Sequence, residues 1–217
     1  MKVKRFIILL VALPVLISLT SCNSVLCFLY GMKASKEYSF SEIRKISGKY
    51  KIEPGDLYIL QSTYNEYFDS IGALYGYNPN TCDTSQLIKP HLQPLQVLFF
   101  DKKGNLVAFH NNCYAGGFPN LRWNRYQSFD SVPAKTVILP DTLLKFSTLI
   151  GFLTTTDANN PDIQGFDNYD YRIAVFWTTF MGRQSKRLIR IINDKYSEDK
   201  NISILYINAD CIFEAQE

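Results

Sequence analysis

Two apolar segments near the C-terminal end constrain the fold most strongly, because both read as strands buried on two sides. The segments "YRIAVFWT" (171–178) and "NISILYIN" (201–208) are apolar at neighbouring as well as alternate positions, which is typical of strands covered on both faces of a sheet. Between them lies a helical pattern whose buried side is Leu188, Ile189, Ile191, Ile192 and Tyr196. A strand, a crossover helix and a second parallel strand form a βαβ unit, so the sequence predicts an α/β sheet with helices on its faces.

Shorter signals upstream predict additional helices and strands. "SFSE" (39–42) has the spacing of a capping box and predicts a short helix. "EPGD" (53–56) predicts a turn that leads into the strand "LYILQS" (57–62), and a helical pattern follows at 64–76. With no later linker of low complexity and no repeat, a single domain over 38–217 is expected.

Two longer patterns lie in the middle of the chain. "PLQVLFFDKKGNLVAFH" (94–110) contains two apolar runs around a polar turn, so it predicts a β-hairpin in which Gly104 can take a positive φ. "DTLLKFSTLIGFL" (141–153) predicts a helix with Asp141 as its N-cap.

The segment from Val175 to Asp210 resembles the central part of a thioredoxin-like domain. It has an apolar strand, a Phe-Trp pair, a loop at a helix start, the helix itself, and an apolar strand that ends in Asn-x-Asp; the matching residues are Phe176, Trp177, Gly182, Asn208 and Asp210. The resemblance covers about 40 residues. It implies a thioredoxin-like mixed sheet flanked by helices.

The two cysteine positions of the thioredoxin CxxC are occupied by Met181 and Gln184. A thioredoxin nucleophile attacks as a thiolate, whereas a thioether cannot ionise and an amide cannot resolve a mixed disulfide. The resemblance therefore implies a redox-inactive domain that binds or scaffolds a protein or peptide. The surface it implies is made of Trp177, Phe180, Met181, Gly182, Gln184 and Pro94.

The other half of such a domain is expected upstream, as in a circular permutation. The strand at 57–62, the helix after it and the hairpin beyond Pro94 resemble that half, including a proline just before a strand. This hypothesis places Gln93-Pro94 beside Met181-Gly182, predicts a cis Gln93–Pro94 bond, and makes 95–100 antiparallel to 172–178.

The N-terminal segment "MKVKRFIILLVALPVLISLTSC" has a basic start, an apolar run and a cysteine after small or polar residues. This is the pattern of a secretory signal, and Leu19-Thr20-Ser21-Cys22 resembles the lipobox of bacterial lipoproteins. The resemblance implies that residues 1–21 are removed, that Cys22 carries lipid, and that 22–37 tether the domain to a membrane. We expect a cell-envelope protein that faces outside the cytoplasm; which membrane it occupies stays open.

Charge argues against a nucleic-acid partner. Removal of 1–21 deletes three of the 23 Lys and Arg residues and leaves 20 of each sign, so the expected mature chain is close to neutral. No Lys/Arg run of the kind that follows phosphates is present.

An alternative function rests on cysteine. Cys27, Cys82, Cys113 and Cys211 remain after Cys22, and outside the cytoplasm Cys82 and Cys113 are the preferred disulfide because both lie in polar, loop-like sequence. A thiol oxidoreductase or redox sensor using this pair is the competing hypothesis, and buried free thiols are the third possibility. The two histidines show no metal-binding spacing, so no metal and no cofactor are expected.

Overall fold

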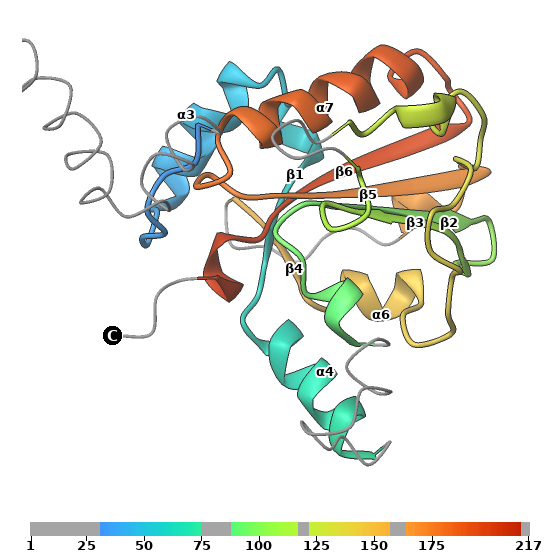
Figure 1. Cartoon of the computed structure of the whole chain (residues 1–217), viewed down its shortest axis with the longest axis horizontal. Coiled ribbons are helices and arrows are strands. Elements are labelled where there is room, and N and C mark those ends of the chain that lie inside the picture. Colours follow the sequence, from blue (N-terminus) through green and yellow to red (C-terminus); the bar gives the residue numbers. More distant parts are fainter. Residues whose placement is uncertain (1–30, 75–87, 117–121, 157–163, 214–217) are drawn as a thin grey trace, which may run out of the picture.

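The computed structural model describes residues 31–74, 88–116, 122–156 and 164–213. In this part of the chain a six-stranded mixed sheet runs in the order β3-β2-β5-β6-β1-β4 (Figure 1). The strands are β1 (Leu57–Leu60), β2 (Gln96–Asp101), β3 (Leu106–Asn111), β4 (Leu153–Thr155), β5 (Tyr171–Trp177) and β6 (Ile202–Asn208). The α/β class predicted from the sequence is confirmed.

The centre of the sheet is parallel and its two margins are antiparallel. β5 pairs parallel with β6, and β6 pairs parallel with β1. β2 runs antiparallel to β5, β3 antiparallel to β2, and β4 antiparallel to β1. Both strand pairings predicted for β5, the parallel one with β6 and the antiparallel one with β2, are therefore confirmed.

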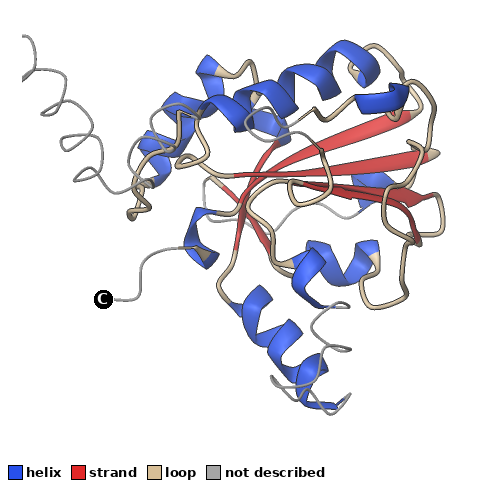
Figure 2. Ribbon diagram, viewed as in Figure 1, coloured by secondary structure: helices blue, strands red, loops and turns tan. Residues whose placement is uncertain are grey.

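In the described residues, four α-helices cover the two faces of the sheet (Figures 1 and 2). Helices α3 (Phe40–Lys49) and α7 (Arg183–Tyr196) lie on one face, and α4 (Thr63–Leu74) and α6 (Phe146–Ile150) lie on the other. The side chains of each strand alternate between two cores, as the pleat requires. In β2, for example, Phe99 joins the α7 core and Phe100 joins the α4–α6 core.

Local sequence signals account for two elements directly. Helix α3 starts at the predicted capping box, in which the Ser39 hydroxyl accepts from the Glu42 amide and the Glu42 carboxylate accepts from the Ser39 amide. The β2–β3 hairpin turns at Gly104, whose φ of +76° is readily available only to glycine. The Asp101 carboxylate closes this turn by accepting from the amides of Lys103 and Asn105.

The helix predicted over 141–153 is wrong in its extent and its cap. Only Phe146–Ile150 is helical, Lys145 is the N-cap residue, and Leu153 begins β4. The Asp141 carboxylate instead accepts from the Leu143 amide at 2.9 Å and lies 2.7 Å from His91 Nε2. A tertiary partner therefore takes the carboxylate that was expected to cap the helix.

Candidate functional site

The loop between β5 and α7 is the first candidate site, because it lies at the carboxyl end of the parallel strands. In open α/β sheets this edge is where ligands usually bind. The loop runs from Thr178 to Gly182, and Gly182 is the N-cap of α7 with φ +45° and ψ −103°. None of the described side chains caps the helix there.

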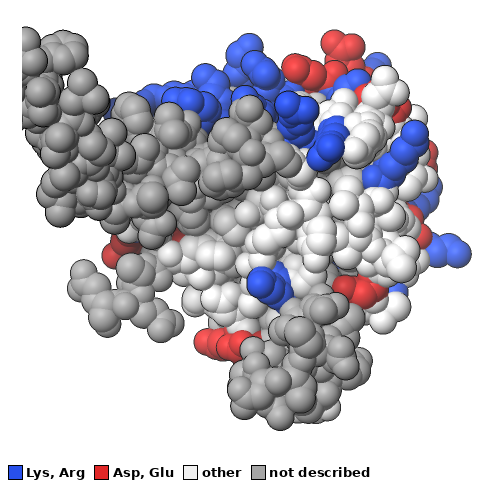
Figure 3. Space-filling view, in the orientation of Figure 1, with Lys and Arg blue, Asp and Glu red and all other residues white. Residues whose placement is uncertain are grey.

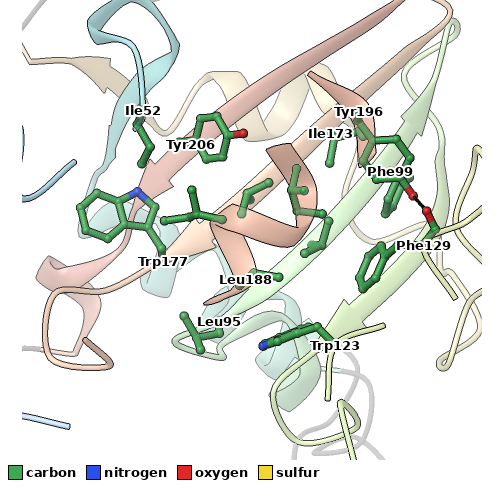
Figure 4. Close-up of a cluster of buried hydrophobic side chains, with 14 of the residues drawn as sticks. Ile52, Leu95, Phe99, Trp123, Phe129, Ile173, Trp177, Leu188, Tyr196 and Tyr206 are labelled. Atoms are coloured by element: carbon green, nitrogen blue, oxygen red, sulfur yellow. Dashed lines mark hydrogen bonds between the residues drawn. The ribbon is translucent and has the colours of Figure 1, made fainter. Parts of the chain in front are cut away.

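Most of the surface predicted around this loop is buried. Trp177, Met181 and Gln184 are 0%, 5% and 3% exposed, and Gly182 is buried as well. Figure 4 shows Trp177 among the side chains packed on the α7 face of the sheet. Phe180 is the half-buried member of the predicted set on this loop.

The cover over this loop is supplied by the chain itself. The Lys33 amide donates to the Phe180 carbonyl at 2.8 Å, and the Tyr50 hydroxyl donates to the Gly182 carbonyl at 3.1 Å. Gly31 lies so close that a Cβ on Gly182 would come within 2.3 Å of its carbonyl oxygen. Part of the segment expected to be a tether is thus packed against the helix start.

A buried carboxylate supports the loop from the end of β6. Asp210 is 3% exposed and accepts from the Thr179 amide and from the Asn208 side-chain amide, both at 2.8 Å. Burial raises the pKa of Asp210, while hydrogen bonds from Asn208 and Thr179 act in the opposite direction. The Asn-x-Asp sequence therefore holds the loop in place through hydrogen bonds.

Pro94 lies at the same end of the sheet as this loop. Gln96, the first residue of β2, pairs with Phe176 near the end of β5 in the antiparallel register. Pro94, just before β2, and Met181, just after β5, therefore lie at the same end of the sheet. The predicted cis Gln93–Pro94 bond is wrong: in the described ranges the cis bond is Val132–Pro133. The turn before β2 is made instead by a 3₁₀ helix at Lys89–His91 and by Gln93, whose side chain donates to the Lys89 carbonyl at 2.8 Å.

The cysteine hypothesis is only partly within the described residues. Cys113 is exposed, forms no disulfide with a described cysteine, and its thiol donates to the Gln93 Oε1 at 2.9 Å. Cys22, Cys27 and Cys82 lie outside the described residues, so lipidation and the Cys82–Cys113 disulfide stay predictions. Cys211 donates to the Leu60 carbonyl at 2.7 Å.

The two histidines are buried in different parts of the fold. His91 stacks on Phe68 with ring centroids 4.9 Å apart, and His110 packs against Phe129 at 4.8 Å. Burial lowers the pKa of His110 to about 4, so this side chain is neutral at physiological pH. Within the described ranges no group of His, Cys, Asp and Glu residues has metal-site geometry.

The second candidate site is an open groove that the sequence did not reveal. It has a volume of about 750 Å³ and lies between the C-terminal part of α7, the first half of β6 and the turn before β1. Its lining includes the acidic residues Glu53, Asp56, Asp194 and Glu198 and the basic residues Lys51 and Lys195. Burial raises the pKa of Asp56, and the nearby Glu53 adds to the shift.

One wall of this groove is a strand edge. β1 pairs with β6 only from Tyr206 to Asn208, so 202–205 have no strand partner on that side among the described residues. Ile202, Ser203 and Ile204 all line the groove. An unpaired strand edge can accept an added strand from a peptide. A sequence pattern cannot show this edge, because it arises from the unequal lengths of β1 and β6.

In comparisons with known proteins, no family model, no curated protein and no solved structure matches the chain. None of the helices in the described ranges is both long and apolar enough to cross a membrane.

Proposed function

We propose that this chain is a lipid-anchored protein of the bacterial cell envelope whose thioredoxin-like domain binds a protein or peptide and performs no dithiol exchange. The observation that carries the proposal is the start of α7. The nucleophile and resolving positions there hold Met181 and Gln184, and both side chains are buried. Neither side chain can form a thiolate or a mixed disulfide.

The strand arrangement supports the thioredoxin-like part of the proposal. The β5-α7-β6 unit is flanked on the β5 side by the antiparallel hairpin β2–β3. This hairpin precedes β5 in the chain, although its expected place in a thioredoxin-like domain is after the strand that corresponds to β6. A permuted chain order would explain why the hairpin and the βαβ unit are adjacent in space but reversed in sequence.

Because the residues at the start of α7 are mostly buried, the proposed binding surface lies elsewhere. Residues 31–33 and Tyr50 cover that region, so an incoming peptide meets mainly Phe180 and Pro94, which are half-buried. The groove beside β6 offers more, because it combines about 750 Å³ of space with unpaired backbone at 202–205. We therefore place the peptide in this groove, as a strand added to β6.

Site-specific photo-crosslinking in intact cells tests this placement. A photoreactive residue at Ser203 should give discrete adducts with an envelope protein, whereas the same residue at Lys103, in the hairpin turn, should give none. If a photoreactive residue at Phe180 gives adducts and one at Ser203 gives none, the binding surface lies at the start of α7 and not in the groove. Absence of adducts at both Ser203 and Phe180 would contradict a binding function.

A thiol oxidoreductase or redox sensor is the second candidate, and the exposure of Cys113 favours it. Such a protein needs an accessible thiol of low pKa. Alkylation of the native protein at several pH values separates the two candidates. Rapid modification of Cys113 in mildly acidic buffer would favour the redox function, and modification that becomes fast only in alkaline buffer would favour the binding module.

A further inference from the structure

Positive charge is concentrated on one face of the domain. The segment 31–51, which includes α3, and the first half of α7, 183–190, together carry ten Lys and Arg residues and two Glu residues. The basic residues are Lys33, Lys36, Arg44, Lys45, Lys49, Lys51, Arg183, Lys186, Arg187 and Arg190. Figure 3 shows Lys and Arg side chains gathered where Figure 1 places α3 and α7. We call this surface the basic face.

Basic residues are distributed unevenly over the domain, which the small net charge of the chain does not reveal. In the rest of the described chain, ten basic residues stand against thirteen acidic ones. Lys45, Lys49 and Lys186 on the basic face are exposed, and none of the three forms an ion pair with a described residue. Their charges are therefore available to an anionic partner.

The path of the chain places the basic face next to the proposed lipid anchor. Gly31 lies against the Arg183 side chain, and Lys33 is hydrogen-bonded to Phe180, so the chain joins the domain at the start of α7. Eight residues lie between Cys22 and Gly31. Even fully extended, the stretch from Cys22 to Gly31 spans only about 30 Å. If Cys22 carries lipid, the start of α7 must stay close to the membrane.

An exposed aromatic residue adds an apolar contact at this face. Phe40 in the first turn of α3 is 46% exposed. Arg44 follows four residues later and therefore lies on the same side of the helix. Aromatic rings beside basic side chains are typical of protein surfaces that lie in the headgroup region of a bilayer.

We propose that the basic face binds the anionic phospholipid headgroups of the membrane that holds the anchor. This inference rests on the proposed lipid anchoring for its choice of partner, because a short anchored segment presents a membrane to this face before any other polyanion. Near an anionic bilayer each Lys or Arg strengthens binding about fivefold. The domain is thereby oriented with α3 and the start of α7 toward the lipid.

Vesicle binding by the full mature chain, 22–217, with Cys22→Ser tests the basic face without the anchor. The protein is mixed with vesicles of phosphatidylcholine alone or of phosphatidylcholine with phosphatidylglycerol, and bound protein is measured after sedimentation. The test variant is Lys45→Gln/Lys49→Gln/Lys186→Gln. The control variant Lys102→Gln/Lys103→Gln/Lys200→Gln removes the same charge at the hairpin turn and the turn before β6, at the opposite end of the sheet.

The expected result is binding to the anionic vesicles only, weakened at least about tenfold in the test variant and much less in the control. Added salt should abolish it, because the contacts are solvent-exposed. Equal binding of the two variants, or no binding to anionic vesicles, would overturn the inference. Retention on duplex DNA without vesicle binding would also overturn it and would assign the face to nucleic acid. Failure of the lipid anchor is detected separately, as absent fatty-acid labelling of the wild type.

Discussion

Replacement of Gly182 by alanine should destabilise the protein by disturbing the start of α7. A φ of +45° with ψ of −103° lies outside the regions that alanine adopts easily, at a cost of about 1–3 kcal/mol. The new Cβ would also lie 2.3 Å from the Gly31 carbonyl oxygen, which is closer than any real contact. Relief requires movement of 31–33 and loss of the Lys33–Phe180 hydrogen bond, which contributes about 0.5–1.5 kcal/mol.

The free energy of unfolding should therefore fall by about 2–4 kcal/mol. For a domain of this size, that corresponds to a decrease in Tm of roughly 5–15 °C. Chemical denaturation followed by circular dichroism measures the first quantity, and a thermal scan measures the second. Limited proteolysis should also cut the variant near Lys33 and Lys36 faster than the wild type, because the segment has lost its contacts.

Gly48→Ala is the matched control. Gly48 lies within α3, and a Cβ there would meet no atom within 4 Å. Alanine should stabilise the helix by about 0.5–1 kcal/mol at this position. If Gly182→Ala were as stable as the wild type, with the segment at 31–33 still protected from protease, the account of how the helix start is covered would be refuted.

Two other predictions concern the anchor and the buried His110. Metabolic labelling with a fatty acid should mark the wild type and fail for Cys22→Ser, and equal labelling of both would exclude lipidation at this residue. His110 should make stability depend on pH: its pKa is about 4 in the folded protein against an ordinary value of 6.5, so the unfolded chain binds the proton first as pH falls. Stability should be lost between about pH 6.5 and pH 4, and His110→Phe should lose less over this range than the wild type; parallel curves would show that another group is responsible.

The sequence predicted those parts of the fold that depend on local pattern. The capping box at Ser39–Glu42, the Gly104 turn and the parallel β5–β6 pair all follow from short-range spacing, and all three are present. The helix over 141–153 failed for a tertiary reason, since the Asp141 carboxylate pairs with His91 and Leu153 joins β1 as part of β4.

The candidate site was predicted less well than the fold. The pattern around Trp177 and Met181 correctly placed a helix start, but nothing in it shows that 31–33 and Tyr50 would cover that start. The groove depends on how far β1 extends along β6, and the basic face depends on α3 and α7 lying on the same side of the sheet. Neither the groove nor the basic face can be predicted by counting charges along the sequence or from the spacing of its apolar residues.

Disulfide exchange is the most direct test of the central proposal, that this α/β domain is thioredoxin-like but performs no dithiol chemistry. Purified protein comprising residues 22–217 with Cys22→Ser should reduce a model disulfide substrate no faster than the uncatalysed reaction, because the proposal assigns the two reactive cysteine positions to Met181 and Gln184. Turnover above that rate, lost when Cys113 is changed to serine, would contradict the claim and assign the activity to Cys113.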